Sequence, residues 1–341
     1  MRIAGRIAGL DLLRGIAIGL VMLRHAFPAP FAGAGVVGVV MFFALSGFLI
    51  TGVLLRELDR DARVDLRRFY LRRARRLVPA LLFLVAGVVA VTLLLDPLDD
   101  RDQLGKTVLV ALTWTGNLPF GHASDATFHL WTLATEEQFY LVWPAVLALA
   151  FARRRVGAAL AVTATGCLLA CLLTLLWLGE APDLAYALPT SWAVCFVIGA
   201  ATRVYAERLV LPDWAVPLAV PVALAGLGAL SVVPLRGHAL TYLAGGPAIA
   251  ALTAVLLLSW RTWTTVSGPA LTALVWLGTV SYAAYLWNYP LTLWLRPHTD
   301  LAGPLAAALT IVLAAVSWYA VERPWQERRW RERRAPSAVV T

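Results

Sequence analysis

Long apolar runs recur along almost the whole chain, and they constrain its fold more than any other feature. Each run is about 20 residues long, which as a helix crosses the roughly 30 Å of hydrocarbon in a bilayer. Hydrophobic residues make up 60% of the 341 residues and charged residues 14%, so too few polar side chains remain to cover a water-exposed surface. The expected spans lie near 9–27, 36–55, 77–95, 131–150, 156–178, 185–205, 214–234, 240–260, 273–294 and 302–321. We therefore predict an all-α integral membrane protein with about ten transmembrane helices.

The basic residues orient these helices. With ten spans, 23 of the 29 basic residues fall on one side, which the positive-inside rule makes cytoplasmic, and both termini lie on that side. Counting 104–120 as another span would move Arg153, Arg154 and Arg155 to the outside. We therefore expect 104–120 to be a re-entrant or surface segment. The charged residues of the first span indicate that it is retained and not cleaved as a signal peptide.

Composition also excludes several functions. The net charge of +9 comes from basic residues between the apolar runs, where they orient helices, so no nucleic-acid partner is expected. Cys167, Cys171 and Cys195 lie inside apolar runs without metal-ligand spacing, so no metal site is expected. The chain also lacks the paired broken helices typical of secondary transporters.

The first expected span carries charged residues that are costly in a membrane. Each ionisable group inside a span costs about 2.5 to 3.5 kcal/mol on insertion scales, so each is a functional candidate. Asp11 and Arg14 are three residues apart and can pair. Arg14 and His25 lie about 20° apart around the helix and about 16 Å apart along it, so they face one way at different depths. A neutral histidine can take a proton from an attacking hydroxyl, and an arginine can hold a phosphate or carboxylate. The alternative for His25 is a structural hydrogen bond between helices.

The expected cytoplasmic loop that ends at Pro79 is unusually rich in arginine and includes Arg72, Arg73 and Arg76. Such a loop could bind the phosphates of a nucleotide cofactor or anionic lipid head groups. Charge alone favours lipid.

Two further stretches, 129–140 and 281–290, place polar side chains in spans. His129 and Glu136 are seven residues apart and share a helix face, so the carboxylate could orient the histidine or hold an acceptor hydroxyl. In the second stretch Asn288 lies among aromatic residues of the kind found at membrane interfaces. We interpret Asn288 as the more informative residue there.

Taken in order, these stretches resemble the membrane-bound acyltransferase family three. The resemblance rests on 11–17 with His25, 42–50, 73–79, the glutamate stretch, the Ser-Tyr stretch and 321–324, and it covers nearly the whole chain. Members of that family O-acylate surface polysaccharides, lipopolysaccharide, peptidoglycan-linked glycans and some macrolides. It implies a multi-pass protein of the bacterial cytoplasmic (inner) membrane.

The resemblance also implies roles for individual residues. His25 would be catalytic with Arg14 as its essential partner, Arg73 and Arg76 would contact the acyl donor together with Arg72, and Glu136 would be a functional carboxylate. Further candidates on the family motifs are Asp11, Ser46, Glu137, Tyr140, Ser281, Tyr282, Asn288 and Glu322. The family often has histidine where this chain has Asn288, so a hydrogen-bonding role is expected there and not proton transfer.

The expected organisation is an acyltransferase domain over 1–322 and a basic cytoplasmic tail over 323–341, disordered at its end. The expected reaction moves an acyl group, most commonly acetyl, from acyl-coenzyme A to a hydroxyl of a carbohydrate-containing acceptor. That acceptor could be a surface polysaccharide, lipopolysaccharide or a glycosylated metabolite such as a macrolide. Acyl-coenzyme A would be a co-substrate, membrane lipid the surroundings, and no cofactor would be tightly bound. The rival is a carrier that flips acyl groups or lipid-linked sugars without covalent chemistry.

Overall fold

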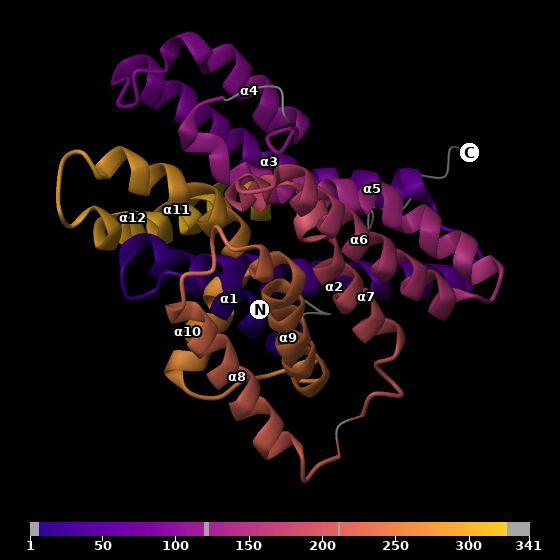
Figure 1. The fold of residues 1–341 in the computed structure, drawn as a ribbon. Coiled ribbons are helices and arrows are strands. Elements are labelled where there is room, and N and C mark those ends of the chain that lie inside the picture. The colour runs from indigo at the N-terminus through magenta and orange to yellow at the C-terminus, as the bar shows by residue number, and fades with distance from the viewer. Residues whose placement is uncertain (1–6, 119–122, 211, 326–341) are drawn as a thin grey trace, which may run out of the picture.

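The computed structural model describes residues 7–118, 123–210 and 212–325, and regular structure over these ranges is helical (Figure 1). The α-helices are α1 (Ala8–Ala26), α2 (Ala34–Asp61), α3 (Leu66–Leu94), α4 (Leu104–Thr113), α5 (Trp131–Ala152), α6 (Val156–Leu178), α7 (Ala193–Val204), α8 (Val216–Val232), α9 (Gly246–Trp260), α10 (Pro269–Thr279), α11 (Ser281–Leu295) and α12 (Ala302–Val316). Short 3₁₀ turns are η1 (Arg101–Gln103), η2 (Asp125–Leu130), η3 (Pro182–Ala187) and η4 (Pro189–Ser191), and π-helical turns are η5 (Thr241–Gly245) and η6 (Ser317–Glu322).

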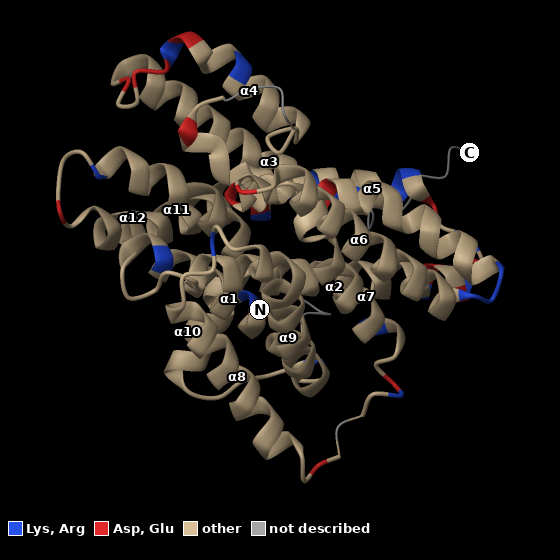
Figure 2. Cartoon of the chain, in the orientation of Figure 1, with Lys and Arg blue, Asp and Glu red and all other residues tan. Residues whose placement is uncertain are grey.

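Five helices of the described chain are long and apolar enough to cross a membrane: α2, α3, α6, Thr241–Trp260 and Ala302–Trp325. The pair α10 and α11 makes a sixth if the two are one bent span. Helices α7 and α8 are apolar but shorter, and α1 carries Asp11, Arg14 and Arg24. Figure 2 shows charged residues mainly at helix ends and in connections, with long uncharged stretches between them. The count of ten spans stays a prediction, and both chain ends and residues 326–341 of the predicted tail lie outside the described residues.

The arginine-rich segment is helical, which corrects the predicted loop. Helix α3 begins at Leu66, eleven residues before the predicted span, and includes Arg72, Arg73 and Arg76. The side chain of Asp65 accepts a hydrogen bond from the backbone N–H of Arg68 at 2.9 Å and so caps the helix. Because arginine is a good helix former, a capped run of arginines continues the helix into the polar region.

Two predicted spans are interrupted. The predicted span 273–294 is bent by 80° between α10 and α11. Helix α10 packs mainly against α1, whereas α11 packs mainly against α12 and also touches α1 and α3, and one straight helix could not make all these contacts. The predicted span 185–205 begins with the 3₁₀ turns η3 and η4, because Pro182 and Pro189 occupy their first positions and cannot donate backbone hydrogen bonds.

The stretch 104–120 does not make a full crossing over its described part, as expected. Its helix α4 has 10 residues, so it is about 15 Å long at the rise of an α-helix, and it packs against α3.

Helix α1 lies at the centre of the molecule, packed by α2, α9, α10, α11 and α12 (Figure 1). Glycines allow the backbones to touch. A Cβ atom on Gly15 would lie 1.9 Å from the carbonyl oxygen of Leu274, and one on Gly199 of α7 would lie 1.9 Å from that of Ala44 on α2. Such small-residue contacts are how membrane helices associate when the solvent is as apolar as their side chains. They hold α1 against α10 and α7 against α2.

We expect Gly15→Ala to lower the stability of the purified protein by about 1 to 3 kcal/mol, since the added methyl group must push α10 away from α1. The matched control is Gly19→Ala on the same helix, where a Cβ meets nothing within 4 Å. Thermal unfolding in detergent measures both. Equal melting temperatures for the two variants would contradict the packing described here.

Candidate active site

A cavity of about 1100 Å³ lies between α1, α2, α3, α5 and α11. It gathers eleven of the fourteen residues predicted from the sequence, which come from opposite ends of the chain. These are Asp11, Arg14, Ser46, Arg72, Arg73, Arg76, Glu136, Tyr140, Ser281, Tyr282 and Glu322. His25, Glu137 and Asn288 are not among the residues that line it. The motifs of the sequence therefore converge on one polar cavity inside an apolar bundle.

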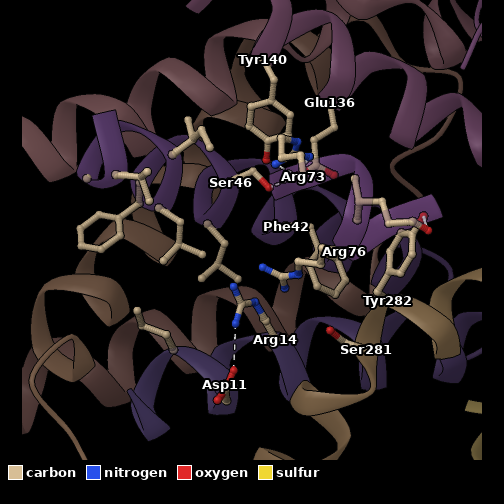
Figure 3. Close-up of a pocket in the computed structure, with 18 of the residues that line it drawn as sticks. Asp11, Arg14, Phe42, Ser46, Arg73, Arg76, Glu136, Tyr140, Ser281 and Tyr282 are labelled. Atoms are coloured by element: carbon tan, nitrogen blue, oxygen red, sulfur yellow. Dashed lines mark hydrogen bonds and ion pairs between the residues drawn. The ribbon is translucent and has the colours of Figure 1, made fainter. Parts of the chain in front are cut away.

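One wall of the cavity is a carboxylate cluster around Glu136. The hydroxyls of Ser46 and Tyr140 both donate short hydrogen bonds to Oε1 of Glu136. Arg73 donates from Nη2 to Oε1 of Glu137 at 2.6 Å, and its guanidinium lies 3.4 Å from the centre of the Tyr140 ring. The same Nη2 is 4.0 Å from Oε1 of Glu136 (Figure 3). Helices α2, α3 and α5 are thus joined, and both glutamates lie next to a cation.

Arg14 and Arg76 project into the cavity from α1 and α3, with their guanidinium groups near each other in Figure 3. Arg14 donates to Oδ1 of Asp11 at 2.8 Å, one helical turn away. Arg76 makes no hydrogen bond or ion pair with the described residues. Arg72 is 3.3 Å from Oε2 of Glu57. Among the three arginines predicted to contact the acyl donor, Arg76 therefore lines the cavity with N–H groups that are available to a ligand.

His25 lies near the other end of α1, where it contacts α11. Its Nδ1 is 2.6 Å from Oδ1 of Asn288. Nδ2 of Asn288 donates to the hydroxyl oxygen of Thr310 at 3.1 Å, and that hydroxyl donates to the carbonyl of Ala306 at 2.6 Å. Tyr289 packs edge-on against the imidazole, with 5.4 Å between ring centres.

This chain of hydrogen bonds determines which nitrogen of His25 carries the proton. The proton of Thr310 is used on Ala306, so the Thr310 oxygen accepts from the Asn288 amide and turns the amide oxygen toward His25. An amide oxygen only accepts, so Nδ1 of His25 must donate. In the neutral ring this leaves the lone pair on Nε2. His25 is thereby prepared to accept a proton at one defined atom.

The structure does not bring every candidate together. Arg14 and His25 lie on one helix at different depths, as expected, and the polar partner of His25 is Asn288 and not Arg14. The predicted contact between Glu136 and His129 is not formed. Nε2 of His129 is 3.0 Å from the carbonyl oxygen of Leu286 instead, because the histidine side chain extends toward α11.

Sequence reasoning missed Thr132 and Tyr285. Both line the cavity, and their hydroxyls are 2.6 Å apart. The Tyr285 hydroxyl also donates to the carbonyl of His129 at 2.9 Å. Nothing in the sequence distinguishes Tyr285 from the aromatic residues around it.

Arg261 marks the end of the cavity nearest the predicted cytoplasmic side. Its Nη1 donates to Oε1 of Glu207 at 2.7 Å, and this hydrogen bond, together with the charge of Arg261, lowers the pKa of the Glu207 carboxyl. Both residues line the cavity, and both lie in connections beyond the helices.

The fold and site are those of an integral-membrane helical protein with an internal polar cavity and a partly buried, hydrogen-bonded histidine. Residues 7–323 match the family model for the acyltransferase domain, and the chain belongs to this membrane-bound acyltransferase family. The chain is therefore a multi-pass membrane protein of the family that the motifs indicated. No solved structure matches the chain.

Curated relatives are O-acetyltransferases. The chain is 28% identical to the peptidoglycan O-acetyltransferase OatA of Listeria monocytogenes over 93% of its length, and 28% identical to the putative peptidoglycan O-acetyltransferase YrhL of Bacillus subtilis over 95%. It is 38% identical to the O-acetyltransferase OatA of Staphylococcus aureus over 41% of its length and 24% of that protein. The chain spans 55% and 56% of the first two proteins, so it corresponds to about half of each.

We expect Arg73→Met to destabilise the protein by about 2 kcal/mol, because two adjacent, partly buried carboxylates lose their cation. The matched control is Arg60→Met, which breaks an exposed pair with Asp61 and should change stability by less than about 1 kcal/mol. Unfolding in detergent, followed by intrinsic fluorescence, measures both. A smaller loss for Arg73→Met than for Arg60→Met would argue against the cluster.

Proposed function

We propose that the protein transfers an acyl group, most commonly acetyl, from acyl-coenzyme A to a hydroxyl of a carbohydrate-containing acceptor. The observation that carries the proposal is the charge of the cavity, which is lined by eight arginines and four carboxylates. Coenzyme A is a polyanion with a diphosphate and a ribose phosphate, and arginine is the residue best suited to bind phosphate in forked geometry.

The donor would bind with its phosphates at the arginines and its pantetheine arm directed toward His25. Arg76, which has no protein acceptor among the described residues, and Arg14, held by Asp11, would contact the diphosphate. Arg73 would act indirectly, since its hydrogen bonds go to Glu137. Arg14 and His25 are about 16 Å apart along α1, a gap that an extended pantetheine arm can bridge.

His25 would act as the base. Its Nε2 would take the proton of the acceptor hydroxyl while the hydroxyl oxygen attacks the thioester carbonyl, and the proton would then pass to the departing thiolate, giving free coenzyme A and the ester. The same Nε2 is the atom that would carry the acyl group if the reaction has two steps. Asn288 supports either route, because it keeps the lone pair on that atom.

The remaining candidates would shape the cavity. Glu136 fixes the hydroxyls of Ser46 and Tyr140, and Tyr282 donates to the carbonyl of Leu77 at 3.3 Å, so α11 is joined to the arginine helix. Arg72 is partly neutralised by Glu57. Ser281 and Glu322 also line the cavity and would contact the donor or its water.

For the acceptor we propose a glycan of the bacterial envelope, made accessible at the cytoplasmic membrane. Support comes from the relatives, two of which are named for peptidoglycan O-acetylation. Other polysaccharides, lipopolysaccharide and glycosylated metabolites have the same reactive group, a sugar hydroxyl. The mass of the labelled product distinguishes them.

We expect His25→Ala to abolish transfer of label from radiolabelled acetyl-coenzyme A to membrane acceptors, since no base remains at the acceptor hydroxyl. The control is His238→Ala, which removes an exposed histidine outside the cavity and should leave transfer at the wild-type level. Unreduced transfer by a well-expressed His25→Ala protein would overturn the assignment. Label in no variant, including wild type, would favour a carrier or a different donor.

We expect Asn288→Leu to lower kcat on the order of 100-fold while leaving KM for acetyl-coenzyme A within a few-fold. Leucine cannot accept the hydrogen bond that fixes the tautomer of His25, and residue 288 does not line the cavity. Asn288→His, which restores the residue that the family often has, should recover much of kcat. Steady-state kinetics of the purified variants test this split. A change confined to KM would show that Asn288 does not act through His25.

A further inference from the structure

The cavity has a second group of arginines, which none of the family motifs contains. Arg56 on α2, Arg203 on α7 and Arg261 after α9 come from three different helices and all line the cavity. Arg261 is held by Glu207 at 2.7 Å and by the carbonyl of Ala206 at 2.9 Å. Arg56 and Arg203 make no hydrogen bond or ion pair within the described chain. We call these three residues the rim arginines.

Helix α2 leaves room for the guanidinium group of Arg203. A Cβ atom on Gly52 would lie 2.7 Å from Nε of Arg203, so the missing side chain makes the room that this guanidinium occupies. One turn earlier on α2, the ring of Phe48 lies 5.9 Å from Arg203. The position of Arg203 is thus set by the backbone of α2 and an aromatic face, and its N–H groups are left free to bind an anion.

The rim arginines lie at a distance from the arginines assigned to the diphosphate. Ser46 and Arg56 both line the cavity and are ten residues apart on α2, about 15 Å along the helix. Ser46 bonds Glu136, beside Arg73, so it marks the deeper group. The cavity therefore presents positive charge at two levels. At the level of the rim arginines, Arg72 is already paired with Glu57, and Arg261 is paired with Glu207.

We propose that Arg203 and Arg56, with Arg261 beside them, form a second anion subsite that binds the ribose phosphate of the acyl-coenzyme A donor. The subsite rests on the proposed function, since it assumes that donor. Coenzyme A carries anions in two places, the diphosphate and the ribose phosphate, and the cavity carries arginines at two levels. A forked guanidinium held in place before binding loses little freedom when it takes a phosphate.

The test compares acetyl-coenzyme A with acetyl-dephospho-coenzyme A, which lacks only the ribose phosphate. For the wild type, KM should be about tenfold lower for acetyl-coenzyme A, the effect of one charged hydrogen-bonded contact. In Arg203→Gln the KM for acetyl-coenzyme A should rise about tenfold and that for the dephospho donor less than about twofold, so the preference disappears. The matched control is Arg208→Gln, which removes the same charge from an exposed position outside the cavity and should keep the preference.

Gly52→Ala provides a second route that keeps every charge. The methyl group would displace Arg203, so the preference for acetyl-coenzyme A should fall there too. The subsite is wrong if the wild type uses both donors equally, or if Arg203→Gln keeps the preference; a lipid phosphate would then be the ligand of the rim arginines. Absence of transfer from either donor by the wild type overturns the proposed function together with the subsite, and is recognised because both donors fail.

Discussion

Charge inside an apolar medium is the constraint on which the rest of this structure depends. Each ionisable group in a membrane helix must find a partner or line a polar cavity. Here Glu136 and Glu137 lie beside Arg73, and Asp11 binds Arg14. The pairs of Arg73 with the two glutamates join α3 to α5, and the pair of Asp11 with Arg14 lies within α1. The same requirement surrounds the cavity with arginines, because only a water-filled or ligand-filled space can accept those that have no carboxylate.

Hydropathy predicted those helices whose boundaries depend on lipid alone. The span 156–178 coincides with α6, and α1 and α5 begin and end within two residues of expectation. Hydropathy failed to predict the helix boundaries that depend on tertiary contacts. The early start of α3 depends on the Asp65 cap, and the bend between α10 and α11 lets α10 pack on α1 while α11 packs mainly on α12. A hydropathy pattern records how a segment meets lipid and contains no information about which neighbour it meets.

For the site, short polar motifs in apolar runs identified candidates of which most line the cavity, because a polar group in lipid is costly unless it has a partner or a polar space. The residues that the sequence analysis missed have common structural explanations. Thr310 is a lone threonine in an apolar run, yet it orients Asn288. Arg203 and Arg261 were interpreted as charges that orient helices, and their convergence from α7 and α9 onto one cavity is visible only in three dimensions. The role of His25 depends in the same way on a hydrogen-bond chain across three helices.

Helix α11 connects the two ends of the site. Just after the bend, Ser281 and Tyr282 line the cavity, and two turns later Asn288 holds His25. Seven residues of helix correspond to about 10 Å, and that length does not change while the helix stays intact. If the donor binds and reacts as proposed, α11 fixes the distance between the place where the donor is held and the place where it reacts. Such an enzyme could accept new acceptors by changing the surfaces around His25, whereas the length of the donor arm that it can use would be fixed by the backbone of α11.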